Sequence, residues 1–366
     1  MEELNGLTGL RFLASFYVFV FHIYLRIPLL FLPDPVETIV SLGALGVNIF
    51  FVLSGFILTY AHLKDYPAAQ LPTVACYGRF MLKRIARVYP AYLVGLLISV
   101  LVSILVHNLP DKFPLVLALD VTMLQSYFPS MAMDWYGGGA WSVSTEFFFY
   151  LVFPLLLPLL MKLTARSLFL LLLTTLIASS LPDLYYAFHQ HTVQFQTTYA
   201  FAPSRLPEFV CGVVLGLLVL RNNFRVSQKV NVVLMLVASL YLAKFGARLM
   251  GFTVHNFAVL PAIMALICVL SQPSPAVYFR WIASRPMQYL GRISFSFYIV
   301  QLPIMLLLDG LLKLHFISST DYYLILLILL ANLALAAMLY ELVEKKSHKY
   351  LSSRISRPMI PIGILS

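Results

Sequence analysis

Ten apolar stretches, each close to the length that crosses a lipid bilayer, constrain the fold of this chain more than any other feature. A spanning helix needs about 20 apolar residues. The stretch YLILLILLANLALAAMLY at 323–340 is apolar on every side, whereas strands of an outer-membrane barrel alternate apolar and polar residues. With 61% hydrophobic and 11% charged residues, the chain is predicted to be an all-α polytopic membrane protein rather than a soluble two-domain protein.

The predicted spans form one helical bundle, with ends uncertain by about three residues. The segment 113–127 is not counted among them, because it is short, contains Pro114 near its start, and includes Asp120 and Gln125. It is predicted to be re-entrant or interfacial. The ten predicted spans are 7–27, 41–61, 88–107, 144–161, 167–181, 206–220, 230–247, 254–270, 290–308 and 322–343.

The distribution of basic residues supports this topology. If ten segments span and the N-terminus is cytoplasmic, 19 of the 25 Lys and Arg residues lie inside, as the positive-inside rule expects. A full span at 113–127 would invert every later loop and place three basic clusters outside. We therefore predict that both termini are cytoplasmic.

No hydrophilic stretch is long enough for a soluble domain, so we expect a single transmembrane domain over 1–350 and a basic cytoplasmic tail over 351–366. The acidic residues Glu2 and Glu3 predict that the first span is retained rather than cleaved as a signal peptide. The basic loops account for the net charge of +10 without a nucleic-acid partner.

Motifs for several common chemistries are lacking from the sequence. It contains no phosphate loop, no dinucleotide glycine fingerprint and no Gly-x-Ser-x-Gly elbow, so a nucleophilic-serine hydrolase is unsupported. His189 and His191 resemble a metal clip without a convincing third ligand, and no metal site is predicted. The three cysteines are expected to pack as apolar residues rather than form disulfides.

Arg11 and His22 lie inside the first apolar stretch. A cation at the centre of a membrane helix costs roughly 2.5–3.5 kcal/mol, so such residues usually face a cavity, a partner or a substrate. On a helix the two side chains share a face with Ser15 and Val18, about 16 Å apart along the axis. Arginine can bind phosphate, and histidine can act as a general base. Alternatively, Arg11 snorkels to lipid phosphate and His22 completes a buried network.

A basic segment precedes the third predicted span, which Pro90 can begin. Within it, Arg84 and Arg87 are three residues apart, so on a helix they would share a face and could bind a polyphosphate together. The alternative is that these residues only anchor the loop in the cytoplasm, as basic loops commonly do.

Polar residues at the opposite end form a second group. The glycines at 137–139 are expected to be a flexible run before Trp141, Ser142 and Glu146, and Glu146 would enter the membrane at the depth of His22. A carboxylate there needs a partner or water. Arg205 and Glu208 begin a later span and are also substrate-binding candidates, although pairing with each other is the alternative.

Six segments, in order, resemble the membrane-bound acyltransferase 3 family, whose members acylate carbohydrates and other acceptors. The resemblance covers nearly the whole chain, and its segments differ in length and composition. They are LTGLRFLASFYVFVFHI (7–23), GALGVNIFFVLSGFILTY (43–60), KRIARVYPAY (83–92), WSVSTEFFFYLVFP (141–154), PSRLPEFVCGVVLG (203–216) and GRISFSFYIVQLPI (291–304).

The resemblance implies an integral enzyme of about ten spans in the bacterial inner membrane. It implies that no cofactor is bound permanently and that a cytoplasmic acyl-CoA, typically acetyl-CoA, is the donor. Catalysis is assigned to His22, with Glu146 expected to orient it, and donor binding to Arg11. Further residues follow from motif position or from the proposed scheme: Arg84, Arg87 and Arg292 for the donor phosphates, and Trp141 and Ser142 for the substrate.

The sequence departs from the family pattern at three positions. Asn48 and Gln301 stand where aspartate and histidine are common, and Glu344 is followed by lysines instead of arginine and proline. These departures argue against a catalytic role at 48, 301 and 344, and they leave Arg11 and His22 unaffected.

The expected acceptor is a hydroxyl of a cell-surface or exported polysaccharide, or of its lipid-linked precursor, with polysaccharide biosynthesis machinery as a partner. A small hydroxylated acceptor such as an antibiotic is the alternative. From another functional class, a proton-coupled transporter would also bury His, Arg and Glu in its spans.

Overall fold

The computed structural model describes residues 4–29, 31–66, 70–189, 191–248, 251–272, 279–318 and 320–355. These residues form helices and turns and contain no β-strand, as predicted. The helices are α1 (Asn5–Tyr24), α2 (Asp34–Ser41), α3 (Gly46–His62), α4 (Val74–Leu105), α5 (Phe113–Thr122), α6 (Gly137–Leu160), α7 (Ala165–Ala178), α8 (Leu181–His189), α9 (Phe195–Tyr199), α10 (Leu206–Asn222), α11 (Gln228–Phe245), α12 (Asn256–Leu270), α13 (Arg285–Lys313), α14 (Tyr323–Leu339) and α15 (Lys345–Ile355).

Ten helical segments in the described chain are long and apolar enough to cross a membrane, which confirms the predicted number and order. Two helices, α4 and α6, begin well before the predicted spans at 88–107 and 144–161. Pro90 lies inside α4, which begins at Val74, so the basic segment is itself helical. The glycine run is the first turn of α6 rather than a flexible loop. A Cβ atom on Gly139 would lie only 2.0 Å from the Cδ2 atom of Leu302 in α13. The absence of a side chain at Gly139 therefore allows Leu302 to pack against this turn.

The segment 113–127 is not among the ten candidate spans, as predicted. Helix α5 has 10 residues and a rise of about 15 Å, half the thickness of a hydrocarbon core. The polar residues of the segment are buried: Asp120 lies in α5 and Gln125 in the turn that follows it. Tyr92 of α4 donates to the Asp120 carbonyl at 2.8 Å, and Gln125 Nε2 donates to the Tyr92 hydroxyl at 3.2 Å. The segment therefore caps one side of α4 and α6 without crossing the bundle.

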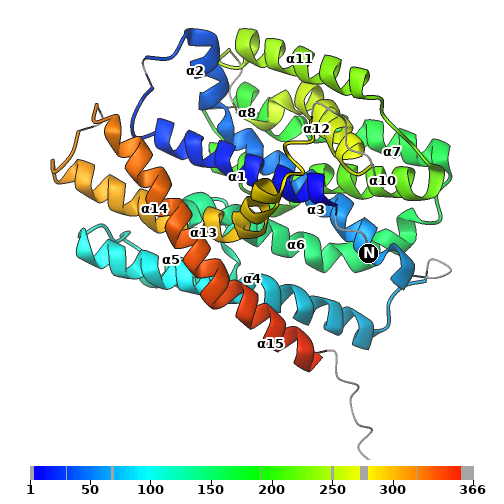
Figure 1. Ribbon diagram of the computed structural model, residues 1–366, viewed down its shortest axis with the longest axis horizontal. Coiled ribbons are helices and arrows are strands. Elements are labelled where there is room, and N and C mark those ends of the chain that lie inside the picture. Colours follow the sequence, from blue (N-terminus) through cyan, green and yellow to red (C-terminus); the bar gives the residue numbers. More distant parts are fainter. Residues whose placement is uncertain are drawn as a thin grey trace, which may run out of the picture.

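Helices α1 and α13 run through the middle of the bundle, side by side (Figure 1). A Cβ on Gly291 would lie 2.0 Å from the carbonyl oxygen of Thr8, so only glycine allows this approach. A second tight pair is α3 and α10, where a Cβ on Gly212 would lie 2.0 Å from the carbonyl oxygen of Val52. The first of these contacts fixes α1, which carries Arg11 and His22, against α13.

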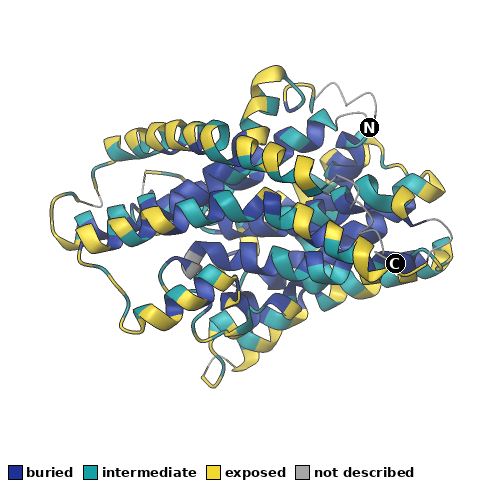
Figure 2. Cartoon of the chain, turned by 90° about the horizontal axis from the view of Figure 1, so that it is seen from below, coloured by how far each residue is buried: buried dark blue, intermediate teal, exposed yellow. Residues whose placement is uncertain are grey.

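The outer helices present apolar side chains to their surroundings. Figure 2 shows buried residues in the centre of the bundle and exposed residues along the outer helices. On α11, Val233 is 57% exposed and Leu240 is 70% exposed, and α14 exposes Leu326 and Leu330 in the same way. An apolar outer surface of this kind suits hydrocarbon rather than water.

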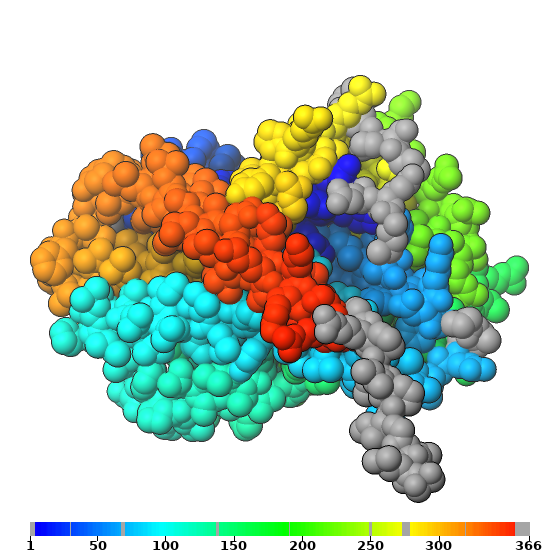
Figure 3. All heavy atoms as spheres, turned by 60° about the horizontal axis from the view of Figure 1, so that its bottom comes forward, coloured from blue at the N-terminus to red at the C-terminus, as the bar shows by residue number. Residues whose placement is uncertain are grey.

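Helix α14 continues through a π-helical turn at Tyr340–Glu344 into α15. The predicted domain boundary after residue 350 falls inside α15, and residues 356–366 of the predicted tail lie outside the described residues. Helix α15 packs against α4 (Figure 3). This contact brings residues 345–355 to the basic half of α4.

Candidate active site

One cavity, of about 570 Å³, gathers the four arginines predicted to bind the donor. We call it the arginine cavity. It lies among α1, α3, α4, α6 and α13, and the π-turn and α15 contribute to its wall. Apart from tyrosines, its ionisable lining residues are Arg11, Arg84, Arg87, Arg292, Lys345, His348, Glu146 and Glu344.

Arg84 is held in place by neighbours at the ends of α3 and α4. Its guanidinium contacts Nε2 of His62, whose Nδ1 lies 2.7 Å from a carboxylate oxygen of Asp65. The same guanidinium lies over the rings of Phe80 and Tyr150, at 5.2 and 5.9 Å from their centroids. Arg84 is therefore a pre-oriented cation in the cavity wall rather than a free surface charge.

Glu146 belongs to the arginine cavity and not to the surroundings of His22. Its Oε1 atom accepts hydrogen bonds from Ser54 at 3.1 Å and from Tyr150 at 2.6 Å. The prediction that Glu146 lies at the depth of His22 and orients it was wrong. Because α6 begins at Gly137, seven residues earlier than the predicted span, Glu146 lies deeper along the helix, near the arginines.

The π-turn places Glu344 in the same cavity. Glu344 is buried, and its Oε2 atom accepts a hydrogen bond from Ser296 at 2.6 Å. A π-turn inserts one extra residue into a helix and shifts the residues that follow around its axis, and such turns are frequent at functional sites. The departure from the family pattern after Glu344 therefore does not remove this carboxylate from the site.

A second cavity, of about 540 Å³, contains His22 on its wall. We call it the histidine cavity. Apart from tyrosines, the ionisable residues in its described lining are His22, Arg26 and Asp309. Arg26 and Asp309 form a two-bonded ion pair, with both N–O distances at 2.7 Å, and Arg26 also donates to the His22 carbonyl at 3.0 Å. The two fixed charges of this cavity thus neutralise each other.

Aromatic rings form one wall of the histidine cavity. Trp141 and Tyr199 lie with centroids 4.8 Å apart, Tyr199 and Phe252 lie 5.1 Å apart, and Phe195 stacks on Tyr199 at 4.9 Å. Burial raises the pKa of Tyr199, so its hydroxyl stays neutral. The wall offers large flat apolar faces with few charges.

His22 has a polar neighbour across the helix interface. Within the described residues its Nδ1 atom is buried without a hydrogen-bond partner, and so are both side-chain polar atoms of Gln301. Gln301 lies on α13 beside the His22 ring. The residue next to the predicted base is therefore an amide from α13 rather than the carboxylate expected from α6.

The four residues predicted to bind substrate lie in three different surroundings. Trp141 lines the histidine cavity and the adjacent Ser142 lines the arginine cavity. Arg205 and Glu208 line neither cavity and are both fully buried. The two side chains pair with each other, which was the alternative that their spacing left open, and a role in substrate binding stays a prediction.

Arg205 and Glu208 instead form a structural network. Arg205 Nε donates to Glu208 at 3.0 Å, and its guanidinium also contacts the Asn48 side chain. Asn256 of α12 donates to the same Glu208 oxygen at 3.0 Å. The Arg205 guanidinium further lies 5.6 Å from the Trp141 ring centroid and 5.2 Å from that of Phe51. The pair thus supports a wall of each cavity from behind.

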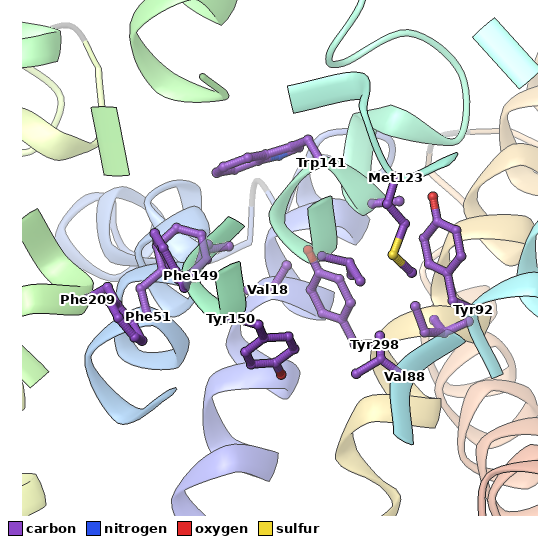
Figure 4. Packing of buried hydrophobic residues seen from close by; sticks show 14 of the residues in the cluster. Val18, Phe51, Val88, Tyr92, Met123, Trp141, Phe149, Tyr150, Phe209 and Tyr298 are labelled. Atoms are coloured by element: carbon purple, nitrogen blue, oxygen red, sulfur yellow. The ribbon is translucent and has the colours of Figure 1, made fainter. Parts of the chain in front are cut away.

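The sequence analysis did not single out several residues that the structure brings to the site. Arg26 and Asp309 carry a weak signal, since both are charges at the edges of apolar stretches. Tyr298 and Tyr150 carried none, because a tyrosine in an apolar helix usually indicates packing. Tyr298 and Val47 line both cavities, so the two cavities meet there. Figure 4 shows Trp141 and Tyr298 among the buried hydrophobic residues, with their rings apart from each other.

The described residues include no group of three or more His, Cys, Asp or Glu side chains that could hold a metal ion. Cys76, Cys211 and Cys268 are free thiols, and the last two are buried. The structure therefore agrees with the expectation that these cysteines do not form disulfides with one another.

Comparison with known proteins assigns the family. The model of acyltransferase family 3, described as an acyltransferase domain, matches residues 4–341. The chain belongs to this family of membrane acyltransferases. It is thus an O-acyltransferase enzyme, and the match covers both cavities up to the π-turn.

Two relatives illustrate the breadth of the family. Acyltransferase MdmB of Streptomyces mycarofaciens is 29% identical over 317 residues, which cover 81% of this chain and 78% of the relative. O-acetyltransferase OatA of Staphylococcus aureus is 23% identical over 379 aligned positions, which cover 94% of this chain but only 57% of that protein. No solved structure matches the chain significantly.

Proposed function

We propose that this enzyme transfers an acetyl group from cytoplasmic acetyl-CoA to a hydroxyl of a cell-surface or exported polysaccharide, or of its lipid-linked precursor. One observation carries the proposal: a cation-lined cavity and a histidine-lined cavity lie along one central helix pair and meet at Val47 and Tyr298. The first suits the phosphates of CoA, and the second suits an uncharged hydroxyl-bearing ring.

The donor is assigned to the arginine cavity by charge. CoA carries a phosphorylated adenosine diphosphate, and arginine binds phosphate through paired, charge-assisted hydrogen bonds. Arg11, Arg84, Arg87 and Arg292 converge from three helices, which a single basic loop could not achieve. The pantetheine arm would extend along α1, since Arg11 and His22 are about 16 Å apart along its axis.

The transfer itself is assigned to His22. Its imidazole accepts the proton of an acceptor hydroxyl while the hydroxyl oxygen attacks the thioester carbonyl. The C–S bond then breaks, the new ester leaves with the acetyl group, and the CoA sulfur takes the proton from His22, which regenerates the base. A covalent acyl-histidine is not required by this scheme. The neutral surroundings of His22, with Arg26 already paired to Asp309, support an uncharged acceptor over an anionic one.

The positive-inside distribution of basic residues supports placement in the bacterial inner membrane, with the arginine cavity facing the cytoplasm and both termini on that side. In this placement the acceptor reaches His22 from the outer side. The machinery that makes or exports the polysaccharide is the corresponding partner.

Labelling tests the proposal directly. Membranes containing the enzyme are incubated with acetyl-CoA radiolabelled in the acetyl group, and glycan, lipid and small-molecule fractions are separated. We expect label in a glycan fraction, released by mild base as an ester requires, and no label with His22→Ala. Label in a small hydroxylated compound would replace the polysaccharide as acceptor. Substrate flux without acetyl-CoA consumption would instead favour a proton-coupled transporter.

A further inference from the structure

Four helices, α1, α3, α6 and α13, line both cavities, and along each helix the lining passes from one cavity to the other. On α1, Arg11 lines the arginine cavity and Val18 lines the histidine cavity; on α6, Ser142 and Trp141 divide in the same way. Val47 of α3 and Tyr298 of α13 line both. The cavities are therefore two parts of one track, interrupted where these two side chains face it.

Tyr298 is fastened at this point by hydrogen bonds to α6. Its hydroxyl donates to the Gly139 carbonyl at 2.7 Å and lies 2.7 Å from the Ser142 hydroxyl oxygen. The Phe50 ring packs edge-on against it, with centroids 6.1 Å apart. Figure 4 shows the Tyr298 hydroxyl directed toward the α6 ribbon. Tyr298 is only 6% exposed although it lines both cavities.

We propose that Tyr298, latched to Gly139 and Ser142, is the gate through which the acyl group passes from the arginine cavity to the histidine cavity. With the latch closed, the ring separates the donor phosphates from His22. Rotation of the ring away from α6 breaks two hydrogen bonds and joins the cavities. The gate would exclude solvent from the track between transfers and would limit the size of the acyl group that reaches His22.

The proposal rests on the proposed function for what passes the gate, but the closure itself can be measured without substrates. A cysteine in the histidine cavity reports whether a charged reagent crosses from the arginine side. The reporter is Met305→Cys, which lines the histidine cavity, in a Cys76→Ser background whose remaining cysteines are buried. The probe is a membrane-impermeant anionic methanethiosulfonate applied to inside-out membrane vesicles.

Native Cys76 verifies the side of application. It is exposed in the first turn of α4, the helix that carries Arg84, so vesicles of the unmodified chain label at Cys76 when the arginine end faces the probe. Tyr289→Ala is the matched control, because this tyrosine is on α13, is 37% exposed and lines neither cavity.

We expect slow labelling of Met305→Cys when Tyr298 is intact. Tyr298→Ala should raise the labelling rate at least tenfold, and Tyr298→Phe, which keeps the ring but loses the latch, about threefold; Tyr289→Ala should leave the rate unchanged. If Tyr298→Ala does not fold, judged by its elution from a sizing column, Tyr298→Phe and Ser142→Ala decide the question. Equal rates with and without the latch, or fast labelling of the intact gate, would overturn the proposal.

Labelling in the presence of acetyl-CoA tests the gate and the proposed donor separately. If the donor occupies the arginine cavity, saturating acetyl-CoA should slow labelling in the Tyr298→Ala background several-fold. Labelling that depends on Tyr298 but not on acetyl-CoA would keep the gate and reject the donor. In the transfer assay, Tyr298→Ala should increase the use of butyryl-CoA relative to acetyl-CoA about fivefold, and an unchanged ratio would remove the role in acyl selection.

Discussion

The two cavities are nearly equal in volume but differ in the net charge of the residues that line them. In the arginine cavity, cations outnumber carboxylates, and most of them face the open space. In the histidine cavity, the charged residues Arg26 and Asp309 form an ion pair with each other, and aromatic rings form one wall. Cations inside a membrane protein are costly, so an excess of cations over carboxylates at one end indicates an anionic ligand there. This difference supports phosphate binding in the arginine cavity and acyl transfer in the histidine cavity.

The strongest test of this contrast removes the base from the histidine cavity. His22→Ala should lower kcat by about 10²–10⁴-fold, the range of general base catalysis, and should leave CoA affinity unchanged. Turnover and calorimetric binding in detergent measure the two quantities. His189→Ala is the control, since this histidine is exposed and lies outside both cavities. A parallel loss of CoA affinity would contradict the separation of the cavities.

The second test removes what the cavities share. Arg205→Met leaves Glu208 as an unpaired buried carboxylate, which typically costs about 3–5 kcal/mol. Because Arg205 stacks behind Phe51 and Trp141, one in each cavity, both donor binding and transfer should weaken together. Thermal unfolding in detergent measures the loss. The double variant Arg205→Met with Glu208→Met should recover much of the stability, and a fully stable single variant would exclude the structural role.

The third test weakens the arginine cavity alone. Arg11→Ala should raise the KM for acetyl-CoA by about 10–100-fold, since a hydrogen bond to a charged group contributes about 1.5–3 kcal/mol. The effect on kcat should be smaller. Arg225→Ala, an exposed arginine outside the cavity, is the matched control. An unchanged KM in Arg11→Ala would leave the arginine with an anchoring role only.

The smallest effect concerns a buried acid outside both cavities. Burial raises the pKa of Asp120 in α5 to about 8, helped by nearby Asp134. The folded protein then holds a proton that the unfolded chain releases near pH 4, so stability is greatest at low pH and falls as pH rises towards 8. Between pH 6 and 7 the loss is about 1 kcal/mol. Asp120→Asn should flatten this dependence in thermal unfolding, with both cavities unaffected; an unchanged slope would show that Asp120 is already ionised.

The fold followed from local properties of the sequence. The length and apolarity of each stretch determine whether it can cross a bilayer, so the ten spans and the short segment at 113–127 were predictable. The helical repeat likewise placed Arg11 and His22 along one helix. Helix ends were less predictable, because proline and glycine commonly end helices, yet Pro90 lies inside α4 and the glycines at 137–139 form the first turn of α6.

The partners of the polar residues depended on contacts between distant parts of the chain. Ser142 and Tyr298 are 156 residues apart, and Arg26 and Asp309 are 283 residues apart. Glu146 could be predicted to need a partner, but the identity of that partner depended on the register of α6 against α3. The same holds for Arg205 and Glu208, whose sequence suits either a substrate site or an internal pair.

A ten-span membrane protein of the acyltransferase 3 type, with an arginine and a histidine on its first helix, could be predicted from the sequence alone. These properties follow from hydrophobicity, helical periodicity and motif order, which need no knowledge of neighbours. Which charged side chains face a cavity, which are fully buried, and where Tyr298 lies between the two cavities became clear from the packing of the helices. Those outcomes depend on how α1, α3, α6 and α13 pack, because a side chain becomes part of a site only when other helices leave space beside it.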